Sequence, residues 1–277
     1  VALAGNPNVG KSTVFNSLTG LKQHTGNWPG KTVTNAQGRY RHRGKNFILV
    51  DLPGTYSLMA NSVEEEVARD FVCFADPDAT VIVADATCLE RNLNLVLQTL
   101  EITSKVVVCV NLIDEAKRKR IRVNLQALSK QLGVPIVGTN ARNGEGLDEL
   151  MCAVYAVAQR PDAVPIRIDY DEAVEQSVAA VEPAVSTALQ DRLSARWVAL
   201  KLIDGDQKLL AAMKKYLGFN LMDRAEVTAA VEKAQEMLRK AGISQETLRD
   251  RIVSRIVKRA EQICRQVVTF ENDKYNQ

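Results

Sequence analysis

Residues 5–12 read Gly-Asn-Pro-Asn-Val-Gly-Lys-Ser, a glycine-bounded loop that ends in a lysine and a hydroxyl. The glycines allow backbone N–H groups to curl around phosphate oxygens. Lys11 would bring a cation to the β- and γ-phosphates, and the Ser12 hydroxyl would bind Mg²⁺. An apolar run precedes the loop and a helical pattern follows it, as this motif requires. The sequence therefore predicts a binding site for a nucleoside triphosphate and Mg²⁺.

A second motif indicates which base is bound. Residues 111–114 read Asn-Leu-Ile-Asp and follow the apolar run 106–110. The Asp114 carboxylate can accept hydrogen bonds from both N1–H and the exocyclic amine of guanine, and adenine offers no such pair of donors. Asn111 would tie neighbouring loops together. The motif therefore favours guanine.

Two further segments complete the order of motifs expected for a GTPase. Asp51 ends an apolar run and can hold Mg²⁺ through water, and the N–H of Gly54 can be offered to a γ-phosphate. Residues 139–142 read Thr-Asn-Ala-Arg, and the Ala141 N–H can reach O6 of guanine. The four motifs occur in the order typical of GTPases: the loop with Lys11, the turn with Asp51, the Asn-x-x-Asp motif and residues 139–142.

The elements that must position these residues are strands alternating with helices. Such alternation predicts an α/β fold, a P-loop GTPase domain with a mainly parallel sheet, over residues 1–160. The expected strands are residues 1–4, 47–51, 80–85, 106–111 and 135–138, with 33–41 as an extra antiparallel strand. The expected helices are residues 12–18, 62–74, 91–102, 123–132 and 147–158.

Residues 161–277 are expected to form a smaller all-α domain after a proline-bounded linker. Glycines follow, and Asp or Ser residues precede, most of the helical patterns. Pro183 should break or kink the pattern at 171–190. The other expected helices are residues 196–203, 207–217, 225–241 and 244–270.

Composition excludes several classes of protein. The chain has 277 residues, 46% hydrophobic and 25% charged, with a net charge of +3. These values exclude a disordered, collagen-like or disulfide-scaffold chain. No apolar run has the roughly 18 residues that a membrane helix needs. Five scattered cysteines indicate reduced thiols, and two histidines exclude a histidine-rich metal site.

Taken together, the motifs resemble translation-factor-like small GTPases, and within them the cytosolic N-terminal region of the FeoB family of bacterial ferrous-iron transporters. The resemblance rests on residues 5–20, 26–33 and 51–58. Its most specific part is Gly-Asn-Trp-Pro-Gly at 26–30. Residues 195–202 resemble the family's guanine-nucleotide-dissociation-inhibitor-like (GDI-like) helical domain. The likeness spans nearly the whole chain.

The resemblance implies roles for particular residues. Thr32 would be the threonine of the first switch, residues 26–31 the mobile part of that switch, and residues 51–58 the start of the second. The catalytic group would be Lys11, Asn8, Thr32 and Gly54. Mg²⁺ would be held by Ser12, Thr32 and Asp51. The nucleotide-binding set would be Gly5, Asn6, Pro7, Asn8, Val9, Gly10, Lys11, Ser12, Thr13, Gly30, Lys31, Thr32, Asp51, Leu52, Pro53, Gly54, Asn111, Asp114, Thr139, Asn140 and Ala141.

The sequence departs from the best-known small GTPases at the catalytic centre. Thr55 follows Gly54 where a water-orienting Gln is usual, and no motif fixes an arginine finger. Asn8 resembles its counterpart in potassium-activated GTPases, in which that Asn and carbonyls of the first switch hold K⁺. Here the carbonyls would be those of Gly26 and Trp28. The alternative is that Asn8 merely suits a tight turn.

The base-binding motifs depart as well. Leu112 replaces the lysine that lies along the base in the commoner motif, which predicts weaker nucleotide binding and easy GDP release. Asn140 stands where serine is usual, so this loop departs from the common motif.

The resemblance implies a GTP hydrolase that uses Mg²⁺ and K⁺ and that regulates or drives ferrous-iron uptake. It would lie on the cytoplasmic side of the bacterial inner membrane and lead into a C-terminal membrane domain beyond residue 277. Small cytosolic proteins of the uptake system and a second copy of the chain are further partners compatible with it. The alternatives are an RNA-associated or assembly GTPase and a nucleotide sensor with negligible turnover. The helical half shows no RNA-binding signature, so no nucleic acid is expected.

Overall fold

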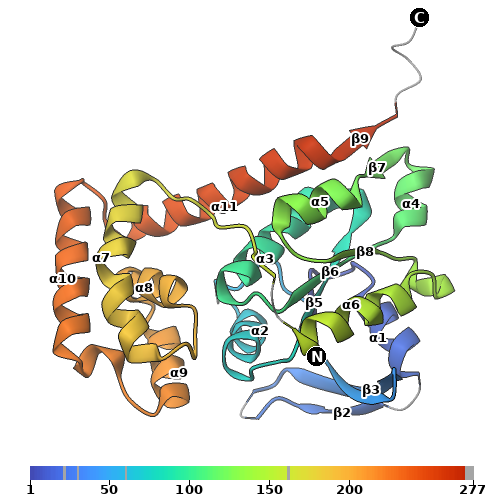
Figure 1. The fold of residues 1–277 in the computed structure, drawn as a ribbon, viewed down its shortest axis with the longest axis horizontal. Helices are drawn as coiled ribbons and strands as arrows, with labels where there is room; N and C mark the ends of the chain where they lie inside the picture. The colour runs from blue at the N-terminus through green and yellow to red at the C-terminus, as the bar shows by residue number, and fades with distance from the viewer. Residues whose placement is uncertain (21–22, 30, 60, 161–162, 272–277) are drawn as a thin grey trace, which may run out of the picture. The chain divides into compact units, whose positions relative to one another are not determined.

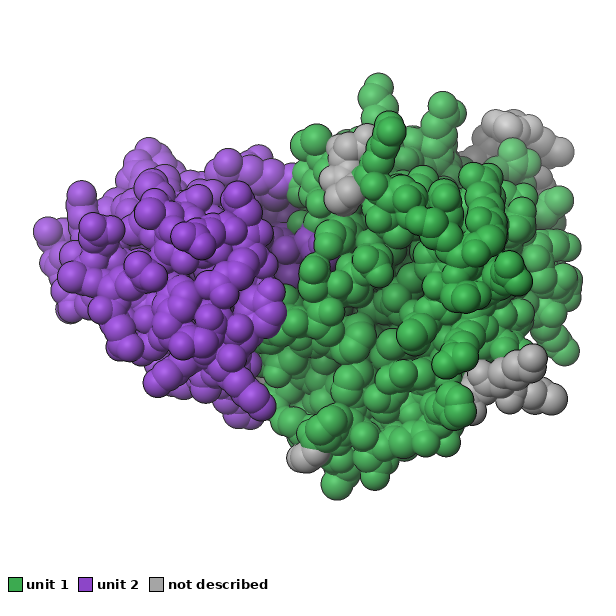
Figure 2. Space-filling model, turned by 60° about the horizontal axis from the view of Figure 1, so that its bottom comes forward, with its two compact units in different colours: residues 1–100, 104–166, 259–277 green, residues 101–103, 167–258 purple. Residues whose placement is uncertain are grey.

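The structure is a computed structural model that describes residues 1–20, 23–29, 31–59, 61–160 and 163–271. Figure 1 shows the fold and Figure 2 the two compact units into which the chain divides. Unit 1 contains residues 1–100, 104–166 and 259–277, and unit 2 contains residues 101–103 and 167–258. The two units therefore do not follow a single cut in the sequence.

Unit 1 is built on one sheet of seven strands in the order β2-β3-β4-β1-β5-β6-β8. The pairs β4–β1, β1–β5, β5–β6 and β6–β8 are parallel, and β2–β3 and β3–β4 are antiparallel. The strands are β1 (Ala2–Gly5), β2 (Gln23–Asn27), β3 (Thr34–His42), β4 (Lys45–Asp51), β5 (Thr80–Asp85), β6 (Val106–Asn111) and β8 (Ile136–Gly138).

Helices cover the central strands because those strands are apolar on both faces. Val81 and Val83 of β5 belong to one core cluster with side chains of α1 and α6, and Ile82 and Ala84 are buried too. Side-chain caps at Ser62 and Asn124 begin α2 and α5. The helices of this unit are α1 (Lys11–Thr19), α2 (Val63–Phe74), α3 (Leu89–Ile102), α4 (Ile113–Arg118), α5 (Leu125–Leu132) and α6 (Leu147–Gln159), with 3₁₀ turns at Ala86–Cys88 and Ala141–Asn143.

Unit 2 is helical. Side-chain caps at Asp171, Ser194 and Asp206 begin its first three helices, and left-handed glycines end two of them. Its helices are α7 (Glu172–Leu189), α8 (Ala195–Asp204), α9 (Gln207–Leu217), α10 (Ala225–Lys240) and the first part of α11 (Gln245–Val267), with a 3₁₀ turn at Leu221–Asp223. Among the described residues no helix combines the length and apolar character needed to cross a bilayer.

A partly buried polar cluster lies in unit 2. The hydroxyl of Tyr170 donates to Glu101 at 2.6 Å, and Arg196 donates to both carboxylate oxygens of Glu175, at 2.6 and 2.9 Å. Burial raises the pKa of Glu101 despite the hydrogen bond from Tyr170. Burial alone would also raise the pKa of Glu175, but hydrogen bonds from Arg196, the Tyr170 N–H and Arg167 outweigh it and lower that pKa to about 2.

The expected fold class is confirmed, with differences in detail. Helix α7 continues through Pro183, so of the predicted break or kink the break does not occur. Pro183 and Ala179, whose carbonyl loses its helical donor, are both exposed, so water can satisfy that carbonyl. Two three-residue strands were not predicted: β7 (Ile121–Val123) pairs antiparallel with β9 (Val268–Phe270). Strand β9 also ends α11 at Val267, three residues before the predicted end of that helix.

Candidate nucleotide-binding site

The phosphate loop joins β1 to α1 and its conformation depends on two residues with positive φ. Gly10, the residue before α1, has φ +84°, and Asn8 has φ +66°. A Cβ on Gly10 would lie 2.3 Å from Nδ2 of Asn111. Position 10 therefore needs glycine for both its backbone angle and its close neighbour. Asn8, Ser12 and Thr13 are exposed on this loop and the first turn of α1, where a ligand can reach them.

Lys11 connects the phosphate loop to the end of β4. It is 8% exposed, and its ammonium donates to the Asp51 carboxylate and, at 2.6 Å, to the carbonyl of Leu52. The N–H of Thr55 donates to the carbonyl of Gly5 at 3.1 Å. The structure therefore brings the lysine loop and the aspartate turn together, as the order of motifs predicts. Pro53 and the exposed Gly54 lie between these contacts in sequence, and Gly54 lies next to Pro7.

Asn111 lies at the end of β6 and contacts two loops at once. Its Nδ2 donates to the Val9 carbonyl at 3.1 Å, and its Oδ1 accepts from the Thr139 hydroxyl at 3.0 Å and the Ala141 N–H at 3.1 Å. Asn111 is 1% exposed. One side chain thus fixes the phosphate loop against the loop after β8. In this structure the Ala141 N–H points to Asn111, whereas the sequence assigned it to guanine O6.

The residues after Asn111 adopt an uncommon turn. Leu112 has φ +63° and precedes α4, and Asp114 lies in the first turn of that helix. The Asp114 side chain is 42% exposed and pairs with Arg118 at 3.3 Å. The backbone of Asn140 bridges to Glu145, which shapes the loop around Ala141. The Asp114 carboxylate is therefore accessible to a base, whereas the Ala141 N–H is buried and bonded to Asn111.

The first switch segment forms part of a hairpin. Gly26 pairs with Asn35 across β2 and β3, and the Trp28 carbonyl accepts from the Lys31 N–H at 3.0 Å. The Trp28 ring packs edge-on against Phe71, with centroids 5.4 Å apart. Lys31 also pairs with Glu66 at 2.9 Å, and Thr32 is exposed. The predicted residue Gly30 lies outside the described residues.

Two residues of α3, Arg91 and Gln98, contact the second switch and were missed in the sequence. Gln98 Oε1 accepts from the Leu58 N–H at 2.7 Å and the Ser57 hydroxyl at 3.1 Å. The Arg91 guanidinium lies 4.2 Å from the Tyr56 ring centroid, and its carbonyl accepts from Asn6 at 3.4 Å. Positions 91 and 98 are seven residues apart and share one helix face. That spacing of two polar residues on one helix face was the only sequence signal for these contacts.

Comparison with known proteins identifies the family. The family Ferrous iron transport protein B matches residues 1–154, and the family FeoB cytosolic helical domain matches residues 170–269. The chain belongs to the FeoB family. Its first part is the family's GTPase domain and its second part the family's helical domain.

Curated relatives agree with this assignment. The Fe(2+) transport protein A/Fe(2+) transporter FeoB fusion protein of Porphyromonas gingivalis is 39% identical over 214 residues, which cover 76% of this chain and 25% of that protein. The Fe(2+) transporter FeoB of Escherichia coli (strain K12) is 37% identical over 216 residues, 74% of this chain and 27% of that protein. The chain thus spans about a quarter of these FeoB relatives.

Solved FeoB structures share the whole architecture. The cytosolic domain of the T. maritima FeoB iron transporter in a GDP form is 34% identical, with a TM-score of 0.75 and 97% of each chain covered. Its GMPPNP form gives a TM-score of 0.77, covering 97% of this chain and 98% of that one. The cytosolic domain of L. pneumophila FeoB is 28% identical, with a TM-score of 0.78 and coverage of 97% and 99%.

Proposed function

We propose that this FeoB chain binds GTP at the phosphate loop and hydrolyses it to GDP and phosphate. The observation that carries the proposal is the Asn111 side chain, which joins the phosphate loop to the base-binding loop. Lys11, held at the end of β4, supplies a positive charge beside the loop whose N–H groups would hold the phosphates. Asp114 selects guanine, and Leu112 weakens the hold on the base.

The residues around Lys11 suit Mg²⁺. Ser12 offers an exposed hydroxyl at the start of α1, and the half-buried Asp51 carboxylate lies beside Lys11. Mg²⁺ prefers such hard oxygen ligands, and Thr32 would add another from the first switch. The ion would neutralise phosphate charge. The Gly54 N–H would offer a hydrogen bond to the transferred phosphoryl group.

We propose that K⁺ supplies the remaining positive charge. Asn8 is exposed on the phosphate loop with φ +66°, and Thr55 is buried with its hydroxyl donating to the Ser57 carbonyl at 2.7 Å. Thr55 therefore has its proton engaged within the chain and does not replace a water-orienting Gln. The Trp28 carbonyl accepts one hydrogen bond, and Gly26 is an exposed residue of the β2–β3 hairpin. A carbonyl oxygen has two lone pairs, so each of these carbonyls can also bind a cation.

Phosphate release in K⁺ and Na⁺ buffers of equal ionic strength tests this proposal. We expect faster GTP hydrolysis in K⁺, and an Asn8→Ala variant that loses the difference while still binding GDP. Asn46→Ala, which changes an exposed asparagine of β4, is the matched control and should keep the K⁺ response. Equal rates in the two buffers, or a K⁺ response that survives Asn8→Ala, would exclude the potassium role.

We propose that the domain serves ferrous-iron uptake from the cytoplasmic side of the bacterial inner membrane. The named relatives are Fe(2+) transporters about four times as long as the segment that this chain matches. The switch state would pass through the helical domain to the membrane domain of the same polypeptide. Small cytosolic proteins and self-association would modulate it. Iron uptake by cells carrying the full-length transporter should fail with Lys11→Ala, and normal uptake would refute the coupling.

Residues 117–120 read Lys-Arg-Lys-Arg, a basic run that could contact RNA. Its ion pairs do not support the RNA-associated alternative. Arg118 pairs with Asp114 at 3.3 Å and Lys119 with Glu115 at 3.5 Å, each one helical turn away. An acidic side chain beside a basic one repels phosphate, which reduces affinity for a nucleic-acid backbone. These pairs favour a solvated face.

A further inference from the structure

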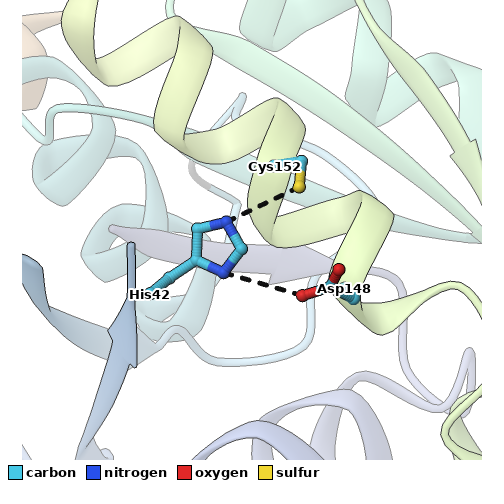
Figure 3. Close-up of side chains that lie close together, drawn as sticks. All are labelled: His42, Asp148 and Cys152. Carbon is cyan, nitrogen blue, oxygen red and sulfur yellow. Dashed lines mark hydrogen bonds and ion pairs between the residues drawn. The ribbon is translucent and has the colours of Figure 1, made fainter. Parts of the chain in front are cut away.

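Three side chains with metal-binding donor atoms meet in unit 1, away from the phosphate loop (Figure 3). His42 is the last residue of β3, and Asp148 and Cys152 lie four residues apart on α6. Residues at that spacing share one helix face, and in Figure 3 both point toward the imidazole. Because His42 and α6 are far apart in sequence, this meeting is a product of the fold.

We propose that His42, Asp148 and Cys152 bind a divalent metal ion of borderline character, of which Zn²⁺ and Co²⁺ are the test cases. Imidazole, thiolate and carboxylate are the ligands that Zn²⁺ uses in proteins. A thiolate in the set disfavours Mg²⁺ and Ca²⁺, which prefer oxygen ligands only. This site would be separate from the Mg²⁺ of the nucleotide and goes beyond the proposed GTPase function.

The distances suit such an ion after a small movement. One ligand atom from each residue can be chosen so that all three lie within 4.8 Å of one another. Metal–ligand lengths near 2.0–2.3 Å place tetrahedral ligands roughly 3.5 Å apart. Sγ of Cys152 already lies 3.6 Å from Nε2 of His42. Asp148 lies 3.7 Å from the other ring nitrogen, Nδ1, so its 79% exposed side chain has to swing toward an ion bound at Nε2.

Aromatic packing holds the imidazole in place without a metal. The His42 ring stacks on Tyr40, with centroids 6.3 Å apart, and meets the edge of Tyr155 at 6.2 Å. His42 is 8% exposed, whereas Asp148 is open to solvent and Cys152 half-buried. The buried ligand is therefore rigid and the accessible ones are adjustable. Remaining coordination positions would hold water, so we expect an exchangeable ion on which folding does not depend.

The nearby guanidinium of Arg43 is expected to affect how tightly the three residues bind a metal ion. Arg43 donates to Sγ of Cys152 at 3.4 Å. The guanidinium occupies a lone pair of the sulfur and its positive charge repels a metal cation. Arg43 is exposed and can turn away. Removing it should therefore strengthen metal binding, whereas a site that served only as an activated thiol would become less reactive.

Cobalt absorption spectroscopy on this chain with bound GDP and Mg²⁺ tests the proposal. We expect Co²⁺ to produce visible bands and a near-ultraviolet sulfur-to-metal charge-transfer band, which reports a thiolate ligand directly. Zn²⁺ should abolish both, and excess Mg²⁺ should not. Cys152→Ser should remove the charge-transfer band, and His42→Gln and Asp148→Asn should each weaken binding about tenfold or more. Cys88→Ser, which changes an exposed cysteine, is the matched control and should keep the band.

The outcomes separate the metal site from an ordinary polar cluster. Absence of the charge-transfer band from the unmodified chain, or its persistence in Cys152→Ser, overturns the proposal. An Asp148→Asn variant with unchanged affinity overturns the three-ligand site. Tighter Co²⁺ binding by Arg43→Ala supports it. Weaker binding by that variant, with slower alkylation of Cys152, identifies a reactive thiol and overturns it.

Discussion

Replacing Asn111 with alanine should loosen both halves of the nucleotide site. The change removes the three hydrogen bonds that Asn111 makes to Val9, Thr139 and Ala141. Each is worth about 1 kcal/mol net, and more where a buried partner is left unsatisfied. Thr139 keeps a contact with Cys109 at 3.2 Å. We therefore expect the free energy of unfolding to fall by about 3 kcal/mol.

The same substitution should weaken GDP binding, because it frees the phosphate loop from the loop that contains Ala141. If about half of the lost 3 kcal/mol affects the binding loops, the GDP dissociation constant rises roughly tenfold, since 1.4 kcal/mol is a factor of ten. Urea unfolding measures the first effect. Titration with a fluorescent GDP derivative measures the second.

Thr99→Ala is the matched control for Asn111→Ala. Thr99 is fully buried and its hydroxyl donates to the Leu95 carbonyl at 2.8 Å within α3. Its loss should lower the free energy of unfolding by about 1 kcal/mol and leave GDP affinity unchanged. If Asn111→Ala lowered stability and left GDP affinity equal to that of Thr99→Ala, the role of Asn111 in joining the two loops would be refuted.

Three further substitutions test other parts of the account. Gly10→Ala should abolish GDP binding because its Cβ would clash with Asn111, whereas Gly44→Ala, with φ +77° and open space around it, should keep binding after a similar backbone cost of about 1–2 kcal/mol. Leu112→Lys should tighten GDP binding and slow GDP release, measured by stopped-flow fluorescence, and unchanged rates would contradict the proposed cause of weak binding. Glu175→Gln should destabilise the protein at neutral pH but not near pH 2. The pKa of Glu175 is lowered from 4.5 to about 2 in the folded protein, so the ionised carboxylate stabilises the fold above pH 4.5. This stabilisation is lost as the pH falls toward 2. Urea unfolding at both pH values checks the sign of the effect.

Local sequence was enough to predict the phosphate loop and the central strands. Residues 5–12 carry their own turn chemistry, and the apolar runs of β1, β5 and β6 are long enough to identify buried strands. Side-chain chemistry also anticipated that Asn111 ties loops together. Its particular partners, Val9 and Ala141, lie far away in sequence and required the fold.

The features that sequence did not predict depend on distant contacts or on exposure. Strands β7 and β9 have three residues each and exist because they pair with one another. The helix through Pro183 depends on an exposed carbonyl that sequence cannot locate. The cluster of His42, Asp148 and Cys152 forms because β3 and α6 lie together in the fold, and the rarity of histidine had argued only against a histidine-rich site. A local sequence pattern does not determine which distant segments of the chain pair with one another.

Phosphate release from GTP and from xanthosine triphosphate, by the unmodified chain and by Asp114→Asn, tests the central claim most directly. The Asp114 carboxylate accepts from the guanine exocyclic amine, whereas an asparagine amide can donate to the oxygen that xanthine has at that position. We predict that the unmodified chain hydrolyses GTP and not the xanthine nucleotide, and that Asp114→Asn reverses this preference. Hydrolysis of neither nucleotide by the unmodified chain, or the same preference in both proteins, would contradict the account.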